Sequence, residues 1–315
     1  MVRAAERIPA VRIAIMGSGG VGGYVGGRLA ASGQDVTFIA RGAHLAAIRE
    51  DGLRIESALG DVTVPPAQAT DDPAAVGPVD LVIFAVKLYD TGQAAGATRP
   101  LIGPATGVVT LQNGVDSVGV LSAALGREHV IGGSAHIAAV IAAPGVIRHT
   151  GTLARFLFGE LDGGHSERVA ALSAALDAAG VDHQVSADIE RDIWSKMVFL
   201  ASFAGLTALV RLPIGRVRAD PDTRALYQAC LAEALAVARA KGIALPDDFV
   251  AQSLARTDQL PYEMKSSLLN DLEGGRRLEL PWLSGAIARM GEELGVATPT
   301  HAFITTSLKL HADAV

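Results

Sequence analysis

The sequence is poor in the residues that organise disulfide-rich, metal-binding and membrane-spanning proteins. It has one cysteine, Cys230, so no disulfide can form within the chain, which suits a reducing compartment. Because Cys230 lies in an Ala/Leu-rich helical pattern, we expect a small buried apolar group and not a nucleophile. The eight histidines have no HxxxH or HExxH spacing and CxxC is absent, so the sequence predicts no metal site. The uncharged run MVFLASFAGLTALV is shorter than the roughly 20 residues of a membrane-spanning helix.

Aromatic residues and basic clusters are also scarce. Aromatics make up 4% of the chain and hydrophobic residues 50%, so the core must consist of Ala, Val, Leu and Ile. The net charge is −6 and no basic block is present, which argues against nucleic acid as the main partner. No apolar leader precedes the first expected strand, so we expect a cytoplasmic protein with no membrane partner. At 315 residues the chain is too long for one ordinary core, and two domains are expected.

The first half of the chain alternates short apolar runs with helical patterns. The expected strands are VRIAIM (11–16), DVTFIA (35–40), DLVIFAVK (80–87) and GVVTLQNG (107–114), and HVIGGSAHIAAVI and ARFLFGEL extend the sheet. Continuous apolar runs of this length are typical of strands that are buried on both faces. The alternation predicts an α/β domain of the Rossmann dinucleotide-binding type, with a doubly wound parallel sheet, over residues 1–186.

After about Val185 the strand pattern disappears. The stretch SADIERDIWSKMVFLASFAGLTALV is helical in pattern, with Ser186 as the expected N-cap. A long helix is expected to begin at Pro221 and to end at Gly242, and further helical patterns follow to the end of the chain. The sequence therefore predicts an all-helical C-terminal domain over residues 187–315.

A glycine-rich turn follows the first expected strand and opens a helix. It fits GxGxxG and consists of Gly17, Ser18, Gly19, Gly20, Val21 and Gly22. The first glycine permits a tight turn, the second lets a pyrophosphate approach the backbone, and the third lets the helix pack on the sheet. The free N–H groups at the helix start would then hold phosphates. The alternative is a glycine turn in an α/β protein that binds no dinucleotide.

The end of the second expected strand discriminates between dinucleotides. An NAD site usually has Asp or Glu there to bind the ribose 2′-hydroxyl. This sequence has Ala40 followed by Arg41, and an arginine can pair with a 2′-phosphate. NADPH is therefore the expected cofactor, unless Arg41 is an ordinary surface residue.

One lysine stands at the head of an apolar helical stretch, IWSKMVFLASFAGLTAL. Only five of the 27 basic residues are lysines, so Lys196 is an uncommon choice in this chain. A lysine can have its pKa tuned by burial, whereas an arginine cannot lose its proton in a protein. Lys196 is therefore a candidate proton donor. The alternative is a side chain that extends to solvent, with Asp192 as its partner.

Together these motifs resemble the ketopantoate reductases (2-dehydropantoate 2-reductases). The resemblance covers nearly the whole chain and rests on the order and spacing of several short pieces. After the glycine turn these are ARG at the second strand, AVK, LQNGV, IWSK, and SSLLNDL followed by RRLELPWLSG. The family's fold, a Rossmann domain followed by a helical domain, agrees with the elements expected above.

The resemblance implies a role for each matching residue. Lys196 matches the general acid, and Glu279 matches the glutamate that binds substrate and helps to set that lysine. Ser267 matches a serine that contacts the substrate carboxylate. Asn113 matches an asparagine beside nicotinamide and substrate, and Lys87 a lysine at the cofactor cleft. Taken singly, the last four could instead be a helix-surface charge, a helix cap, a turn former and a strand-end charge.

The sequence departs from the family in one respect. Well-known members carry asparagines four and eight residues after the catalytic lysine, where this chain has Leu200 and Ala204. These spacings share the lysine's helical face. The substrate pocket should therefore be more apolar, which leaves the exact substrate open.

The function implied by the resemblance is NADPH-dependent reduction of a 2-oxo acid to a 2-hydroxy acid. The first candidate is ketopantoate to pantoate in pantothenate and coenzyme A biosynthesis, by an enzyme that could form a homodimer. A reductase of another branched or aromatic 2-oxo acid is the alternative within this class. A non-catalytic NADPH-binding sensor should have lost Lys196 or Glu279, and a structural oligomer would not need Arg41 or the glycine turn.

Overall fold

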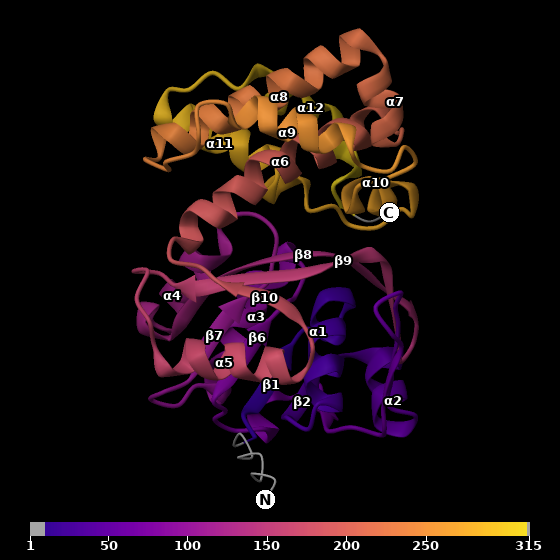
Figure 1. Cartoon of the computed structure of the whole chain (residues 1–315), viewed down its shortest axis with the longest axis vertical. Helices are drawn as coiled ribbons and strands as arrows, with labels where there is room; N and C mark the ends of the chain where they lie inside the picture. The colour runs from indigo at the N-terminus through magenta and orange to yellow at the C-terminus, as the bar shows by residue number, and fades with distance from the viewer. Residues whose placement is uncertain (1–9, 314–315) are drawn as a thin grey trace, which may run out of the picture. The chain divides into compact units, whose positions relative to one another are not determined.

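The chain folds into two compact units (Figure 1). Two hydrophobic core clusters lie in the unit that contains the sheet, and one lies in the helical unit. One unit contains Met1–Gln112 and Ser117–Ile189, and the other contains Asn113–Asp116 and Glu190–Val315. The computed structural model describes residues 10–313. The first nine residues, over which the sequence predicts no leader, lie outside that range.

The first unit is built on one ten-stranded mixed sheet. Its strand order is β4-β3-β9-β8-β7-β6-β1-β2-β5, and β10 pairs with β9. The strands are β1 (Arg12–Met16), β2 (Asp35–Ile39), β3 (Leu53–Glu56), β4 (Val62–Val64), β5 (Ala69–Thr70), β6 (Leu81–Phe84), β7 (Gly107–Thr110), β8 (Val130–Ala143), β9 (Val146–Glu160) and β10 (Asp182–Val185). The helices are α1 (Gly20–Ala31), α2 (Gly42–Glu50), α3 (Thr91–Thr98), α4 (Ser117–Leu125) and α5 (Glu167–Ala178), with short 3-10 turns η1 (Pro73–Ala75), η2 (Leu88–Asp90), η3 (Arg99–Leu101) and η4 (Arg127–His129).

The predicted parallel arrangement is present in most of the sheet, and the pairs β8–β9 and β3–β4 are antiparallel. Strands β7, β6, β1 and β2 pair in parallel, as predicted. Strands β8 and β9 instead form a long antiparallel hairpin, so the prediction of a wholly parallel sheet is wrong there. The two strands are joined by a tight turn in which Gly145 has φ +73°, and no crossover helix separates them.

Helix α1 packs against two separate parts of the sheet, at β1 and at β3. Strand β3 is joined to the sheet by parallel pairing with β9. A Cβ at Gly26 would lie 2.7 Å from Ile15 of β1, whereas a Cβ at Gly27 would lie 2.6 Å from Ile55 of β3. The helix therefore approaches strands on two sides, in a half-barrel. Glycine lowers helix stability by roughly 0.5–1 kcal/mol relative to alanine, and here this close packing offsets that cost.

The described residues of the second unit form helices and loops and contain no strand, which confirms the predicted fold class. Its helices are α6 (Ile189–Val210), α7 (Ile214–Ala219), α8 (Pro221–Ala240), α9 (Phe249–Asp258), α10 (Ser267–Glu273), α11 (Ser284–Leu294) and α12 (Pro299–Leu308), with 3-10 turns η5 (Leu280–Trp282) and η6 (Lys309–His311). The long helix begins at Pro221 as predicted, with Asp220 as its N-cap. The predicted N-cap of α6 is wrong, because α6 begins at Ile189 and Ser186 Oγ instead accepts a hydrogen bond from the N–H of Asp188.

Helix α6 forms part of the core of this unit. It extends upstream of the uncharged run, and by length and composition alone it could cross a membrane, but 61% of its apolar window is buried inside the protein. A Cβ at Gly205 would overlap Ser284 of α11 and lie 3.2 Å from Ile304 of α12, so glycine allows these helices to pack closely. Cys230 on α8 is fully buried, as predicted, and burial raises the pKa of its thiol to about 12.

The packing of α1 against β8 is testable at Gly20, where a Cβ would overlap the backbone carbonyl of Ala139. We expect Gly20→Ala to lower the free energy of unfolding by about 1–3 kcal/mol, because backbone must move to relieve the overlap. Gly96→Ala in α3 is the matched control, since no atom lies within 4 Å of its added Cβ. The control should raise stability by roughly 0.5–1 kcal/mol. Urea unfolding followed by circular dichroism measures both, and an unchanged stability of Gly20→Ala would contradict the packing.

Candidate active site

The second unit brings two of the predicted residues, Asn113 and Glu279, next to Lys196. The Nζ of Lys196 donates a hydrogen bond of 2.8 Å to Oδ1 of Asn113. Burial lowers the pKa of Lys196 to about 8, and the negative charge of Glu279 acts in the opposite direction. The ammonium group therefore has an amide oxygen as a partner and a carboxylate close enough to influence its proton.

Local structure fixes each of these partners. Glu279 precedes η5 and is only 6% exposed, because Leu278 and Leu280 on either side of it are buried. It is therefore not a helix-surface charge. Asn113 comes directly before Gly114, whose φ of +76° forms the turn after β7. Lys196 itself is partly buried on α6, so a ligand has access to it.

Ser267 lies in the same unit, as the first residue of α10, and it is exposed. The cap of this helix is Ser266, whose Oγ accepts a hydrogen bond from the N–H of Leu269 at 3.0 Å. Ser266 Oγ also lies 2.8 Å from Oγ1 of Thr207 on α6, so the start of α10 is fastened to α6. The helix-cap role therefore belongs to Ser266, and the hydroxyl of Ser267 remains accessible.

The two positions that depart from the family differ in their surroundings. Leu200, one turn after Lys196, is partly buried and packs against the core of this unit. Ala204 has no exposed surface. Of the two, only Leu200 has surface that a substrate could contact.

The glycine turn in the first unit has the features of a phosphate site. Gly17 adopts φ +95°, where other residues would be strained, and a Cβ at Gly19 would meet no atom within 4 Å. Among the described residues, no side chain caps α1 and no acidic group lies in its first turn. The first N–H groups of α1 are thus available to an anion, and the residues present fit a dinucleotide.

His44 on α2 fastens the glycine turn to the β8–β9 hairpin, a role that the sequence analysis missed. Its Nε2 donates to the carbonyl oxygen of Ser18 at 2.8 Å, and its Nδ1 accepts from the N–H of Gly145 at 3.0 Å. Only a neutral imidazole makes both bonds, and burial lowers the pKa of His44. Its only signal in the sequence is its position shortly after Arg41.

Arg41 and Lys87 lie in the loops that follow two strands of the first unit. Arg41 follows β2, is exposed, and precedes α2, and none of the described residues engages its guanidinium in a hydrogen bond or ion pair. Lys87 follows β6, is also exposed, and precedes η2. Arg41 follows its strand closely, as predicted, whereas the strand expected over residues 80–87 ends at Phe84, so Lys87 lies three residues beyond it as the N-cap of η2.

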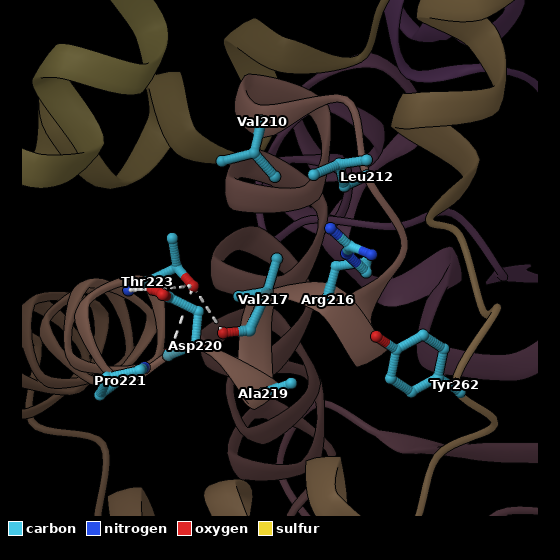
Figure 2. A pocket seen from close by; sticks show the side chains of 9 residues that line it. All are labelled: Val210, Leu212, Arg216, Val217, Ala219, Asp220, Pro221, Thr223 and Tyr262. Atoms are coloured by element: carbon cyan, nitrogen blue, oxygen red, sulfur yellow. Dashed lines mark hydrogen bonds between the residues drawn. The ribbon is translucent and has the colours of Figure 1, made fainter.

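A pocket of about 440 Å³ lies elsewhere in the second unit and contains none of the predicted site residues. Figure 2 shows its lining side chains, which come from the end of α6, from Leu212 in the loop after it, from α7, from the start of α8 and from Tyr262. At roughly 1.5 Å per residue, Val210 in this lining is about 21 Å along α6 from Lys196. The pocket is thus distinct from the site at Lys196. Within residues 10–313 no group of three or more His, Cys, Asp or Glu side chains could hold a metal ion.

Known proteins resemble this chain over nearly its whole length. Residues 13–163 match the family described as "Ketopantoate reductase PanE/ApbA", and residues 188–312 match its C-terminal part. The 2-dehydropantoate 2-reductase of Mesorhizobium japonicum is 34% identical over 92% of this chain and 94% of its own. An uncharacterized oxidoreductase, YkpB of Bacillus subtilis, is 33% identical over 96% of this chain and 99% of its own.

Solved structures agree with these matches. The PanE/ApbA family ketopantoate reductase of Ralstonia eutropha superimposes with a TM-score of 0.87 at 35% identity, covering 96% of this chain and 98% of that one. With a family match that spans both units, the chain belongs to the ketopantoate reductase family, and it is an oxidoreductase that acts on a CH–OH group with a nicotinamide cofactor.

Proposed function

We propose that the protein uses NADPH to reduce a 2-oxo acid, with Lys196 as the proton donor. The observation that carries the proposal is the contact of the Lys196 ammonium with Asn113 beside the charge of Glu279. Ketopantoate is the first candidate substrate, because relatives that cover most of the chain are 2-dehydropantoate 2-reductases. The product, pantoate, would then serve pantothenate and coenzyme A biosynthesis. The cytoplasmic location and the homodimer remain predictions of the sequence.

In this mechanism Lys196 neutralises the charge that develops on the substrate's carbonyl oxygen. A bound nicotinamide would supply the hydride for the carbonyl carbon. As negative charge grows on the oxygen, the Nζ of Lys196 stabilises it and delivers a proton. With a pKa of about 8, Lys196 is mostly protonated at neutral pH and can still release its proton. Asn113 and Glu279 keep the ammonium in its charged form before the reaction.

Residues of the first unit would hold the cofactor. The N–H groups at the start of α1 would bind the pyrophosphate beside Gly17 and Gly19. Arg41 is available to pair with a 2′-phosphate, which favours NADPH over NADH. Lys87, in the loop between β6 and η2, would contact the same cofactor, and Asn113 would contact both nicotinamide and substrate. In the second unit, the accessible hydroxyl of Ser267 would bind the substrate carboxylate.

The role of Lys196 is tested by Lys196→Ala. We expect kcat to fall by about 10²-fold or more, because the general acid is lost, while NADPH still binds. Lys265→Ala is the matched control, since Lys265 is an exposed lysine of the same unit that pairs with Glu273. In the wild type, reduction needs protonated Lys196, so kcat/KM should fall as pH rises above about 8. Near-normal turnover of Lys196→Ala would remove the residue from the mechanism.

The cofactor preference is tested by Arg41→Asp. We expect weaker NADPH binding and little change for NADH, because a charge-assisted pair with the 2′-phosphate becomes a repulsion. Arg155→Asp is the control, since Arg155 is an exposed arginine that donates to Gln184 of β10. Isothermal titration calorimetry gives the two dissociation constants. Equal affinity of the wild type for NADPH and NADH would refute the assignment.

The apolar surface of Leu200 suggests the substrate's character. A substrate hydroxyl buried beside Leu200 without a partner would cost about 1–3 kcal/mol, or roughly tenfold to a hundredfold in specificity. We therefore expect the wild type not to favour ketopantoate strongly over 2-oxoisovalerate, which lacks the hydroxyl.

Leu200→Asn should raise the ratio of kcat/KM for ketopantoate to that for 2-oxoisovalerate, and Leu200→Met, which keeps the site apolar, should not. Ala204→Asn is expected mainly to destabilise the helical unit, since Ala204 has no exposed surface. A wild-type preference for ketopantoate of about a hundredfold or more would contradict the apolar pocket.

A further inference from the structure

The segment Asn113–Asp116 belongs to the second unit, although the chain on both sides of it belongs to the first. All three of its side chains contact the rest of the second unit, and the fourth residue is Gly114. Asn113 accepts the hydrogen bond from Lys196, and Val115 packs against the helical core. The carboxylate of Asp116 accepts hydrogen bonds of 3.1 and 3.3 Å from one guanidinium nitrogen of Arg289 on α11.

We propose that Asp116 and Arg289 are positioning residues, whose ion pair keeps the side chain of Asn113 on the ammonium of Lys196. This inference rests on the proposed function of Lys196. Asp116 and Arg289 are 173 residues apart in sequence, and neither was assigned a role above.

The argument starts from the short distance along the chain between the two anchors. Only Gly114 and Val115 separate Asn113 from Asp116, and Gly114, at φ +76°, adds no side-chain contact of its own. We therefore expect a displacement of Asp116 by about 1 Å to move Asn113 as well. Lengthening the 2.8 Å contact with Lys196 by that amount would take it outside hydrogen-bonding range.

The ion pair suits positioning better than stabilisation. The side chains of Arg289 and Asp116 are 50% and 31% exposed, and pairs this accessible to solvent add little to folding stability. Because the pair adds little to folding stability, the variants that lack it should still fold. Arg289 also pairs with Glu293 one turn along α11, at 3.2 Å, which provides a matched control on the same guanidinium.

Loss of the pair should change the chemistry of Lys196 in a specific direction. The Oδ1 of Asn113 favours the charged form of the lysine, and so does the carboxylate of Glu279, which precedes η5. Asp192 lies one turn earlier on α6 itself. When Asn113 moves away and these carboxylates stay, Lys196 loses its proton at lower pH.

The test is the pH profile of kcat/KM in Arg289→Gln and Asp116→Asn. We expect the alkaline limb to move to lower pH by about 0.5–1 unit, with activity at low pH nearly unchanged. The double variant should shift no further than either single one, since both remove one interaction. Arg289→Lys should keep most of the wild-type profile, and Glu293→Gln should keep all of it.

A second readout does not depend on turnover. The rate at which acetic anhydride labels Lys196, followed by peptide mass spectrometry against pH with Lys265 as internal reference, reports deprotonation of the lysine directly. The labelling curve of Lys196 should shift by the same amount in Arg289→Gln.

The proposal would be overturned if neither the labelling curve of Lys196 nor the alkaline limb of kcat/KM shifted in Arg289→Gln. It would also be overturned if that variant lost activity equally at every pH, or if Glu293→Gln showed the same shift. If the wild type reduces no 2-oxo acid, the proposed function fails, and the labelling curves still decide whether the pair positions Asn113.

Discussion

The placement of one ammonium group in an apolar helix is the constraint on which the rest of the candidate site depends. Removing water from Lys196 lowers its pKa to about 8, although the charge of Glu279 opposes the shift. The amide oxygen of Asn113 replaces part of the lost solvation with a fixed dipole at 2.8 Å. A guanidinium at this position would stay charged throughout and could not release a proton. Lysine is uncommon in this chain, and at this position it can supply a proton that an arginine would retain.

The surroundings of Lys196 are arranged so that its partners are held by apolar packing. Glu279 lies between two buried leucines, which fix the backbone that carries the carboxylate. Further along α6, Gly205 allows α11 and α12 to pack close to the helix, and Ser284 at the start of α11 donates to the carbonyl of Ala201. A polar site of few groups thus rests on a tightly packed helical core.

In the first unit, helix α1 packs against strands of the sheet on two sides. The first N–H groups of helix α1 lie at the glycine turn, and glycines at successive turns of the helix allow this close packing. Their intrinsic cost to the helix is offset by contacts with Ile15 and Ile55. His44 then connects the turn with the long hairpin by two hydrogen bonds. Rigid placement of backbone N–H groups is what phosphate recognition requires.

The sequence by itself determined the α/β class, the helical second half and the position of the glycine turn. These features depend on hydrophobic period and turn chemistry, which are local properties of the chain. It also singled out Lys196, Asn113 and Glu279, because short motifs in a fixed order resemble a known family. The hairpin was missed, since apolar runs in long strands look alike whether their partners run parallel or antiparallel.

Only the tertiary structure decided which distant groups meet. It buried Ala204 completely and left part of Leu200 exposed, although helical spacing puts both on the face of Lys196. It made Ser266 and not Ser267 the cap of α10, and it paired Asp116 with Arg289 across 173 residues. No local pattern encodes such contacts, because each depends on how separate elements pack, and packing is settled by the whole chain at once.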